Sequence, residues 1–446
     1  MNNTTDHPDT PNSPGLFHPS RPVYRYTLLF FVSLLTFGSY FAYDSIGAIE
    51  TTLIKELGLS RETIGNSYTF YSLAAIVIVF FGGMLIDRLG TRRASLLFSV
   101  LVTLGSVIVA VSGNVMTLYL GRFIFGAGSE SLVVAQSAIL AKWFKGKELA
   151  LAFGIALSIS RLGTLFSFNT MELISKQFDS YKTALWAAAL LCGVSLLSNL
   201  VYNLMDLKGE RELALADEGG GDRIVFGDIK RFPASYWYVT MLCVTFYSAI
   251  FPFTALSTDM FHDKWKVPTT IASSGGFFQN VFANFLNMTS TAPGITSIII
   301  FASMVFAPFA GHLVDRVGRR ASLMVVGSLV LIPSHLALGL SDHSPVYPMV
   351  ALGGAFVLVP AAMWPSVPLI VEKSLTGTAF GLMTAIQNVG LALFPFLNGR
   401  LRDLTNSYTA SQCMFAALGI VGLVFAVLLL RSDKSIGGVM EKGRQE

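Results

Sequence analysis

The sequence predicts an all-α membrane protein with twelve transmembrane helices in two pseudo-symmetric six-helix bundles. Of its 446 residues, 53% are hydrophobic and only 13% are charged, whereas soluble domains usually carry about 25% charged residues. Twelve apolar segments are each long enough, at roughly 20 residues, to cross a bilayer as a helix. A Gly-Asp-Arg-Gly motif also occurs twice, at corresponding places in the two halves of the chain. These observations exclude a water-soluble protein.

The predicted spans form two sets of six. The first set, the bundle 26–205, contains 26–47, 64–86, 94–112, 116–140, 148–171 and 182–205. The second set, the bundle 236–430, contains 236–259, 290–312, 321–340, 346–371, 377–400 and 410–430. Between them, 206–235 includes the polar run ERELALADEGGGDR and is predicted to be a linker. Residues 1–25, rich in Pro, Asn and Thr, are predicted to be a disordered tail, and 431–446 a second tail.

Lysine and arginine residues predict the orientation of the spans, because these residues are enriched in cytoplasmic segments. With the N-terminus inside, most of the 31 Lys and Arg residues fall in the linker, the tails and the inner loops. Both tails and the linker are therefore predicted to be cytoplasmic. The N-terminal segment lacks the basic region, short apolar core and cleavage site of a signal peptide.

The long loop between the seventh and eighth spans contains an amphipathic segment. Its apolar residues recur at helical spacing at Phe277, Phe278, Val281, Phe282, Phe285 and Leu286, and its other face carries Gln279, Asn280, Asn284 and Asn287. This pattern predicts a short helix on the outer surface of the membrane, within an insertion near 271–293. A disordered insertion is the alternative.

The repeated motif follows the second and the eighth spans. It reads Gly83-Met-Leu-Ile-Asp87-Arg88-Leu-Gly90 in the first copy and Gly311-His-Leu-Val-Asp315-Arg316-Val-Gly318 in the second. This repeat resembles that of the major facilitator superfamily, and the resemblance extends over nearly the whole chain. It implies transport by alternating access between two bundles. On that basis we expect a gating and structural role, without substrate contact, for Gly83, Asp87, Arg88, Gly90, Asp315, Arg316 and Gly318.

Charges inside the membrane are the strongest candidates for a binding site, because each costs several kcal/mol to place there. Counted along the helices, Glu130 lies roughly 21 Å from the outer end of its span and Arg161 roughly 18 Å from the inner end of its own. The second half carries Asn388 in place of Arg161 and an apolar residue near 357 in place of Glu130. One interpretation is an ion pair between the two. The other is that they hold the ammonium and the carboxylate of a zwitterion, and the spacing permits a small peptide.

Polar and aromatic side chains are expected to complete the cavity. Tyr40, Tyr43 and Asp44 share one face of the first span, although Asp44 lies close enough to the outer end to reach water. The remaining candidates are Tyr68 and Tyr71 on the second span, Arg122 on the fourth, Trp364 on the tenth, and Gln387 and Asn388 on the eleventh. The alternative for each aromatic residue is packing, and for the amides hydrogen bonding between bundles.

Several segments resemble one branch of the superfamily, the lysosomal dipeptide transporters. The most specific are Gly121-Arg122-Phe-Ile-Phe-Gly-Ala-Gly-Ser-Glu130-Ser-Leu and Trp143-Phe-Lys-Gly-Lys-Glu-Leu. The resemblance implies a dipeptide uniporter in which Glu130 contacts the peptide amino terminus and Arg161 its carboxylate. Relatives in animals have an accessory subunit and an acidic-dileucine sorting signal. The N-terminal tail has no such signal, so we expect a monomer in the plasma membrane without that subunit.

The residues give weaker support to other functions. A facilitator or proton-coupled carrier of another organic anion or zwitterion is the main alternative, and a non-transporting receptor on the same fold is a further one. The sequence shows no nucleophile–base set and no cluster of metal ligands, so we expect no catalytic residue, no metal and no cofactor. A net charge of +4 is too small for a strongly basic nucleic-acid-binding protein. The expected partners are dipeptides and the lipid bilayer.

Overall fold

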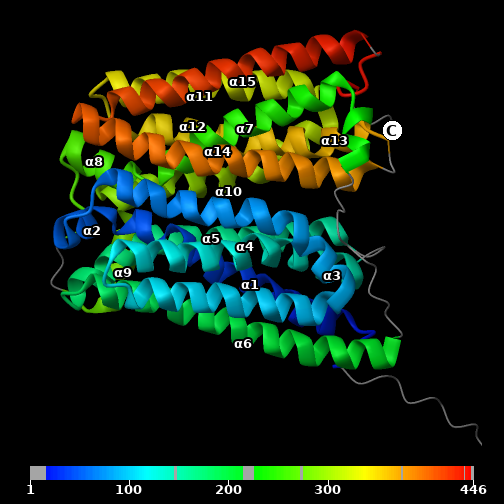
Figure 1. The fold of residues 1–446 in the computed structure, drawn as a ribbon, viewed down its shortest axis with the longest axis horizontal. Coiled ribbons are helices and arrows are strands. Elements are labelled where there is room, and N and C mark those ends of the chain that lie inside the picture. Colours follow the sequence, from blue (N-terminus) through cyan, green and yellow to red (C-terminus); the bar gives the residue numbers. More distant parts are fainter. Residues whose placement is uncertain are drawn as a thin grey trace, which may run out of the picture.

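The protein is built from long, nearly parallel helices, as the computed structural model shows (Figure 1). The structure describes residues 17–144, 148–213, 226–271, 275–372, 375–435 and 437–442. It contains no strand among them, which confirms the all-α prediction. We predict a gating and structural role for Gly83, Asp87 and Asp315. The side-chain positions at these residues lie outside what the structure describes.

The N-terminal half runs to the end of the sixth helix. Its elements are α1 (Pro22–Ala48), α2 (Glu50–Leu57), α3 (Arg61–Val111), α4 (Val115–Phe144), α5 (Leu149–Gln177) and α6 (Tyr181–Leu213). The C-terminal half follows the short η1 (Phe226–Arg231). Its elements are α7 (Ala234–Thr254), α8 (Ser257–Trp265), α9 (Phe277–Leu286), η2 (Met288–Ser290), α10 (Ala292–Val317), α11 (Arg320–Leu340), α12 (Val346–Met363), η3 (Trp364–Ser366), α13 (Val367–Ile370), α14 (Thr376–Thr405) and α15 (Thr409–Ser435).

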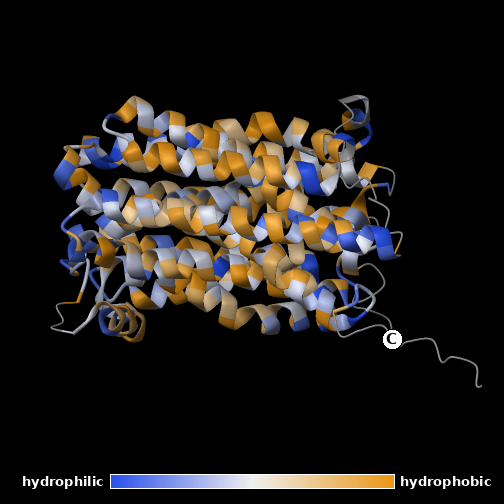
Figure 2. Ribbon diagram, turned by 90° about the horizontal axis from the view of Figure 1, so that it is seen from below, coloured by the Kyte–Doolittle hydropathy of each residue, from blue (hydrophilic) through white to orange (hydrophobic). Residues whose placement is uncertain are grey.

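The helices are long and apolar enough to make this an integral, multi-pass membrane protein. Eleven described segments meet the length and hydropathy of a membrane span. The first part of α3, residues 61–89, corresponds to the remaining predicted span, so the structure contains the twelve predicted crossings. Hydrophobic residues follow the length of the helices and hydrophilic residues gather at both ends (Figure 2).

Glycine produces the turn in each copy of the repeated motif. Gly90 interrupts α3 with φ 76° and ψ 163°, so that the second and third spans meet there at a kink. Gly318 ends α10 with φ 69°. Both φ values lie in the region that side chains disfavour and that glycine adopts freely. Glycine at these two positions therefore permits the turn, while the gating role stays a prediction.

Several helices extend beyond their predicted edges. α1 begins at Pro22, because proline suits the first turn of a helix, so residues 22–25 are helical rather than part of a disordered tail. α6 continues to Leu213, into the predicted linker. Residues 437–442 of the predicted tail pack against the start of α11, where the backbone N–H of Arg320 donates to the carbonyl of Met440 at 3.0 Å.

The predicted amphipathic helix is present as α9. Its face toward the protein carries the buried Asn280 and Asn284, whereas Phe278, Phe282 and Leu286 are exposed. This arrangement, with the polar face inward, is opposite to that of a helix on a water-soluble protein and suits a lipid-facing surface. Its place on the outer surface of a membrane stays a prediction, and residues 272–274 of the predicted insertion lie outside the described residues.

The two halves meet along two seams, α3 against α14 and α5 against α10. We call the end of the molecule with the start of α1 and the end of α15 the tail end, and the opposite end, with α2, α8 and α9, the far end (Figure 1). Glycines close the first seam toward the far end: a Cβ atom on Gly65 would lie 2.1 Å from the carbonyl oxygen of Pro395, and one on Gly399 2.2 Å from that of Arg61. Neither position has room for a side chain, so α3 and α14 are in backbone contact.

Candidate functional site

Glu130 lies on α4 beside α3, and a tyrosine holds it. The Tyr71 hydroxyl donates to Glu130 Oε1 at 2.7 Å. Gly126, one helical turn earlier, makes this approach possible, because a Cβ there would lie 2.3 Å from the Tyr71 carbonyl oxygen. The partner of this half-buried acid is therefore a neutral hydroxyl, which leaves the acid able to pair with a cation.

Arg161 lies on α5 and reaches across to the C-terminal half. Its Nη1 donates to the Ser303 hydroxyl on α10 at 3.0 Å. Its guanidinium carbon lies 5.1 Å from the ring centroid of Phe356 on α12. Among the described residues no ion pair joins Glu130 to Arg161. The structure therefore does not support the interpretation of these two residues as a locking ion pair.

Arg122 on α4 is enclosed by aromatic rings. Its guanidinium carbon lies 4.6 Å from the ring centroid of Tyr68, 5.2 Å from that of Tyr43 and 5.4 Å from that of Tyr71. It also donates to the carbonyl of Tyr43 at 3.2 Å, and its residue is only 1% exposed. Such cation–π contacts are worth about 0.5–2 kcal/mol each, so Arg122 fixes the tyrosines. Its direct contact with a substrate stays a prediction.

Tyr43 and Asp44, which are predicted to share one face of the first span, pack against α3 and α5. The ring centroids of Tyr43 and Tyr71 lie 4.8 Å apart. Asp44 is buried, and its Oδ2 accepts a hydrogen bond from Thr164 of α5 at 2.6 Å. The expectation that Asp44 reaches water is therefore wrong, because α5 covers it.

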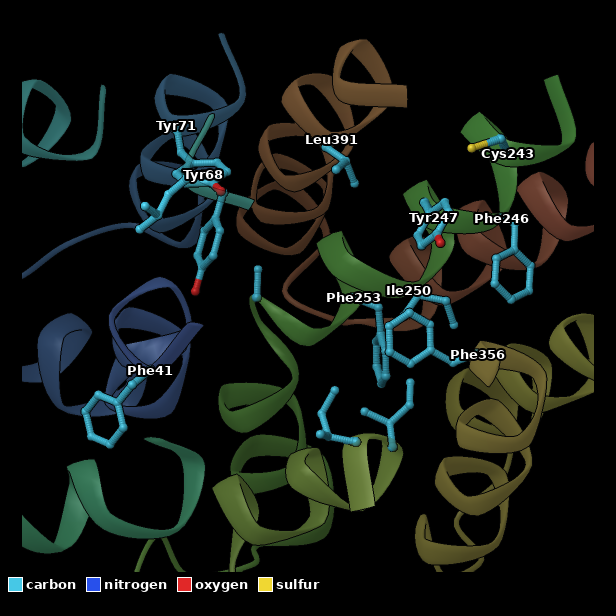
Figure 3. Packing of buried hydrophobic residues seen from close by; sticks show 14 of the residues in the cluster. Phe41, Tyr68, Tyr71, Cys243, Phe246, Tyr247, Ile250, Phe253, Phe356 and Leu391 are labelled. Carbon is cyan, nitrogen blue, oxygen red and sulfur yellow. The ribbon is translucent and has the colours of Figure 1, made fainter. Parts of the chain in front are cut away.

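The C-terminal half contributes aromatic and amide side chains. Trp364 Nε1 donates to the Tyr247 hydroxyl at 3.0 Å, and Gln387 Oε1 accepts from Cys243 Sγ at 3.4 Å. Asn388 is buried, and its Oδ1 has no hydrogen-bond partner among the residues that the structure describes. In the close view, α14 with Leu391 separates Tyr68 and Tyr71 of α3 from Tyr247 of α7 (Figure 3).

Three contributors to the site were not predicted from the sequence: Tyr247, Ser303 and Phe356. The only signal in the sequence is a tyrosine or serine inside an apolar span, and serines are frequent in these spans. Their importance depends on the seam between halves, which the sequence pattern does not reveal.

At the tail end, ion pairs join helices of the first half. Asp206 of α6 is fully buried; it accepts from Lys142 Nζ at 2.8 Å and from Trp143 Nε1 at 2.6 Å. Arg92, which follows the first motif, pairs with Glu210 at 2.9 Å. These contacts attach the part of α3 after the Gly90 kink to α6 and are consistent with the structural role expected of that motif, while Arg88 and Arg316 are exposed.

At the far end, polar contacts join the two halves. Arg61 of α3 makes two hydrogen bonds to Asp259 of α8, at 2.8 and 3.2 Å. Tyr408 donates to the same carboxylate at 2.6 Å, and Glu50 accepts from the backbone N–H of Asp259. The backbone N–H of Glu62 donates to Asp403 of α14 at 2.8 Å.

Comparison with known proteins identifies the family. The profile of the Major Facilitator Superfamily matches residues 32–289 and 269–444. A lysosomal dipeptide transporter, MFSD1, from Homo sapiens is 32% identical over 95% of this chain and 90% of its own length, and that from Danio rerio is 33% identical over 93% and 88%.

Solved structures show the same fold. The nucleoside transporter NupG aligns with a TM-score of 0.70 at 15% identity, over 90% of this chain and 98% of that one. A mutant peptide transporter, POT, in complex with sulfate aligns with a TM-score of 0.69 at 17% identity, over 93% and 96%. These proteins are transporters and not enzymes, and this chain belongs to the major facilitator superfamily, in the same family as MFSD1.

Proposed function

We propose that the protein carries dipeptides across its membrane by alternating access, as a uniporter. The observation that carries the proposal is the pair Glu130 and Arg161. They are opposite charges on neighbouring helices, and each is held by a neutral hydroxyl instead of by the other. An acid then binds the peptide ammonium and the arginine binds the carboxylate, to which it can make two parallel hydrogen bonds.

The spacing of these charges along the helices permits a small peptide as substrate. The two charges of an amino acid share one Cα atom, and each further residue adds roughly 3.8 Å between the chain ends. The relatives named as lysosomal dipeptide transporters support the same substrate class. Tyr43, Tyr71, Trp364, Gln387 and Asn388 then line the path, and Arg122 orients the tyrosines.

Transport by purified protein in liposomes tests the proposal. We expect counterflow of labelled alanyl-alanine, and Glu130→Gln and Arg161→Ala should each lower it at least about 10-fold, since a charge-assisted hydrogen bond is worth about 1.5–3 kcal/mol. Glu56→Gln and Arg431→Ala change exposed charges of the same types and serve as controls. Full uptake by both site variants would overturn the proposal.

Two further measurements separate the alternatives. A carrier of amino acids or monocarboxylates would exchange those compounds better than alanyl-alanine in the same liposomes. A proton-coupled carrier would accumulate dipeptide when a pH gradient is imposed, whereas a uniporter would only equilibrate it. A receptor would bind dipeptide without any counterflow.

We further propose a monomer in the plasma membrane, with both tails and the linker in the cytoplasm and with 26–205 and 236–430 as its two moving bundles. The tail end is then cytoplasmic, the far end is outside, and the far-end contacts close the outer side. Protection of a C-terminal tag from external protease in intact cells is the expected result. Digestion of that tag would reverse the orientation.

A further inference from the structure

The seam between α5 and α10 contains two similar hydrogen bonds. Asn169 Nδ2 donates to the Ser297 hydroxyl oxygen at 2.9 Å, and Arg161 Nη1 donates to that of Ser303 at 3.0 Å. Both serines are fully buried. Each hydroxyl also donates its own proton to a carbonyl of α10, Ser297 to Gly294 and Ser303 to Ile300, both at 2.7 Å. With its proton committed, each serine oxygen presents only lone pairs to α5.

The two donors differ in charge. Asn169 is neutral, and its Nδ2 also donates to the carbonyl of Leu165 at 2.8 Å within α5. Arg161 carries a full charge, yet its described partners are a neutral hydroxyl and the ring face of Phe356. A carboxylate neutralises the guanidinium and can accept two parallel hydrogen bonds from it, whereas a hydroxyl oxygen carries no charge to offset. A carboxylate therefore competes with Ser303 for Arg161, and nothing comparable acts on the Asn169 bond.

We propose that Ser303 is a built-in substitute for the substrate carboxylate. With the site empty, it holds Arg161 across the α5–α10 seam and so ties the two halves together. A peptide carboxylate takes over the arginine, the Arg161–Ser303 bond breaks, and the seam loosens. The inference rests on the proposed function, because it requires that Arg161 binds a carboxylate.

By this exchange of partners, the substrate itself promotes the conformational change that transports it. A ligand can shift a conformational equilibrium only through different contacts in the two states. Displacing Ser303 provides such a difference, because it removes a tie between halves that exists only when the site is empty. The other seam, α3 against α14, is closed by backbone contact at Gly65 and Gly399. The Thr69 hydroxyl of α3 also donates to the carbonyl of Ala392 of α14 at 2.5 Å, and Arg161 takes no part in these contacts. The loaded carrier should therefore reorient faster than the empty one.

The consequence can be measured as a ratio of two rates. In liposomes, exchange of labelled for unlabelled alanyl-alanine uses only the loaded carrier, whereas net efflux into peptide-free buffer also requires the empty carrier to return. We expect the wild-type protein to exchange faster than it releases peptide. Ser303→Ala should raise net efflux, bring the ratio toward one and lower the KM about 5-fold, because a competing acceptor of Arg161 is gone.

Ser297→Ala is the matched control. It removes the corresponding hydroxyl from the same seam, with the same bond to α10, but from a neutral partner. We expect it to leave both the KM and the ratio unchanged. The inference is overturned if the two variants change the ratio alike, or if Ser303→Ala raises the KM, which would make Ser303 a substrate contact.

Alanyl-alaninamide provides a second readout. This peptide has no carboxylate, so it should compete poorly against alanyl-alanine in the wild-type protein and accelerate exchange little. If Arg161→Ala keeps full alanyl-alanine uptake, the proposed function fails. If Arg161→Ala loses uptake while Ser303→Ala keeps the wild-type ratio and KM, the function stands and only the role of Ser303 is wrong.

Discussion

The two ends of the molecule are held together in different ways. At the tail end, the ion pairs among described residues join helices of one half, as Lys142 does with Asp206. At the far end one described ion pair, Arg61–Asp259, crosses between halves, whereas Arg402–Asp263 and Lys176–Glu172 each stay within one half. Among the described residues, the hydrogen bonds that join the two halves all lie between the level of Arg161 and the far end. The tail-end ion pairs therefore hold helices within a half, whereas the far-end contacts form the closed joint between the halves.

The tail end also shows which features of the internal repeat the two halves share. Asp206 ends the first half and Asp433 lies 227 positions later, at the end of the second, and both are fully buried. Asp206 binds side chains of α4. Asp433 instead accepts from the backbone N–H of Met440 at 3.0 Å, in the strap of residues 437–442. The repeat thus keeps the acid but not its partner.

Asp206→Asn should have the largest effect of the changes considered for the two ends. It removes the charge that faces Lys142, whose side chain is only 2% exposed. Breaking a buried pair from one side costs about 3–5 kcal/mol, and we expect the lower end of that range because Lys142 keeps its ion pair with Glu210 at 2.7 Å. We expect a large fall in the melting temperature of the purified protein in detergent. Asp433→Asn is the comparison, since its partner is a backbone N–H; an equal fall for both variants would refute the distinction between the halves.

Arg61→Ala should open the far end with a smaller loss of stability. Asp259 keeps the Tyr408 hydroxyl but loses two hydrogen bonds from the other half. Because Arg61 is partly exposed, we discount the pair to about 1–2 kcal/mol, which shifts populations by a factor of about 5–30.

Spin labels measure that shift. A pair at Glu56 and Lys266 spans the far end, and a pair at Lys208 and Lys434 spans the tail end, all at exposed positions. The exposed Cys413 is replaced by Ser beforehand. In Arg61→Ala the far-end distance should lengthen and the tail-end distance should shorten. Unchanged distributions for both pairs would show that Arg61 does not hold the joint.

Much of this arrangement could be predicted from the sequence, because long apolar runs must form helices in a bilayer and the repeated motif marks their symmetry. Glu130 and Arg161 stood out since a charge in such a run is costly. Helix edges were less certain: α6 extends to Leu213 because acids after residue 205 find cations on α3 and α4. The cross-half partners Ser303 and Asp259 could not be found, since a serine within an apolar run and an acid at the end of one gain meaning only from packing.

Glu50 should make the far-end joint sensitive to pH. It lies in α2, outside the candidate membrane spans, and is fully buried; within the described part of the chain its Oε2 has no hydrogen-bond partner. Burial raises the pKa of Glu50 well above its usual range, Asp259 raises this pKa further and Arg61 lowers it. Tyr68 and Tyr408 also face it.

The sign of the effect follows from the raised pKa. The closed joint favours protonated Glu50, so closure is strongest at low pH and is lost as pH rises through that pKa. The far-end spin-label distance should therefore lengthen with rising pH in the wild-type protein. Glu50→Gln, which imitates the protonated acid, should stay closed across the same range. A variant that retains the full pH response would place the titrating group elsewhere.

Glu441→Ala tests the smallest of these contacts and the least expected part of the fold. Glu441 lies in the strap and accepts from the backbone N–H and the hydroxyl of Ser322, at 2.9 and 2.7 Å, near the start of α11. A carboxylate at the first turn of a helix satisfies N–H groups that have no partner within the helix, worth about 0.5–2 kcal/mol. We expect a small fall in melting temperature, less than for Asp206→Asn, with unchanged far-end distances. The hydrogen bonds of the strap among described residues go to the second half, so a change in those distances would mean that the strap also controls the joint between halves.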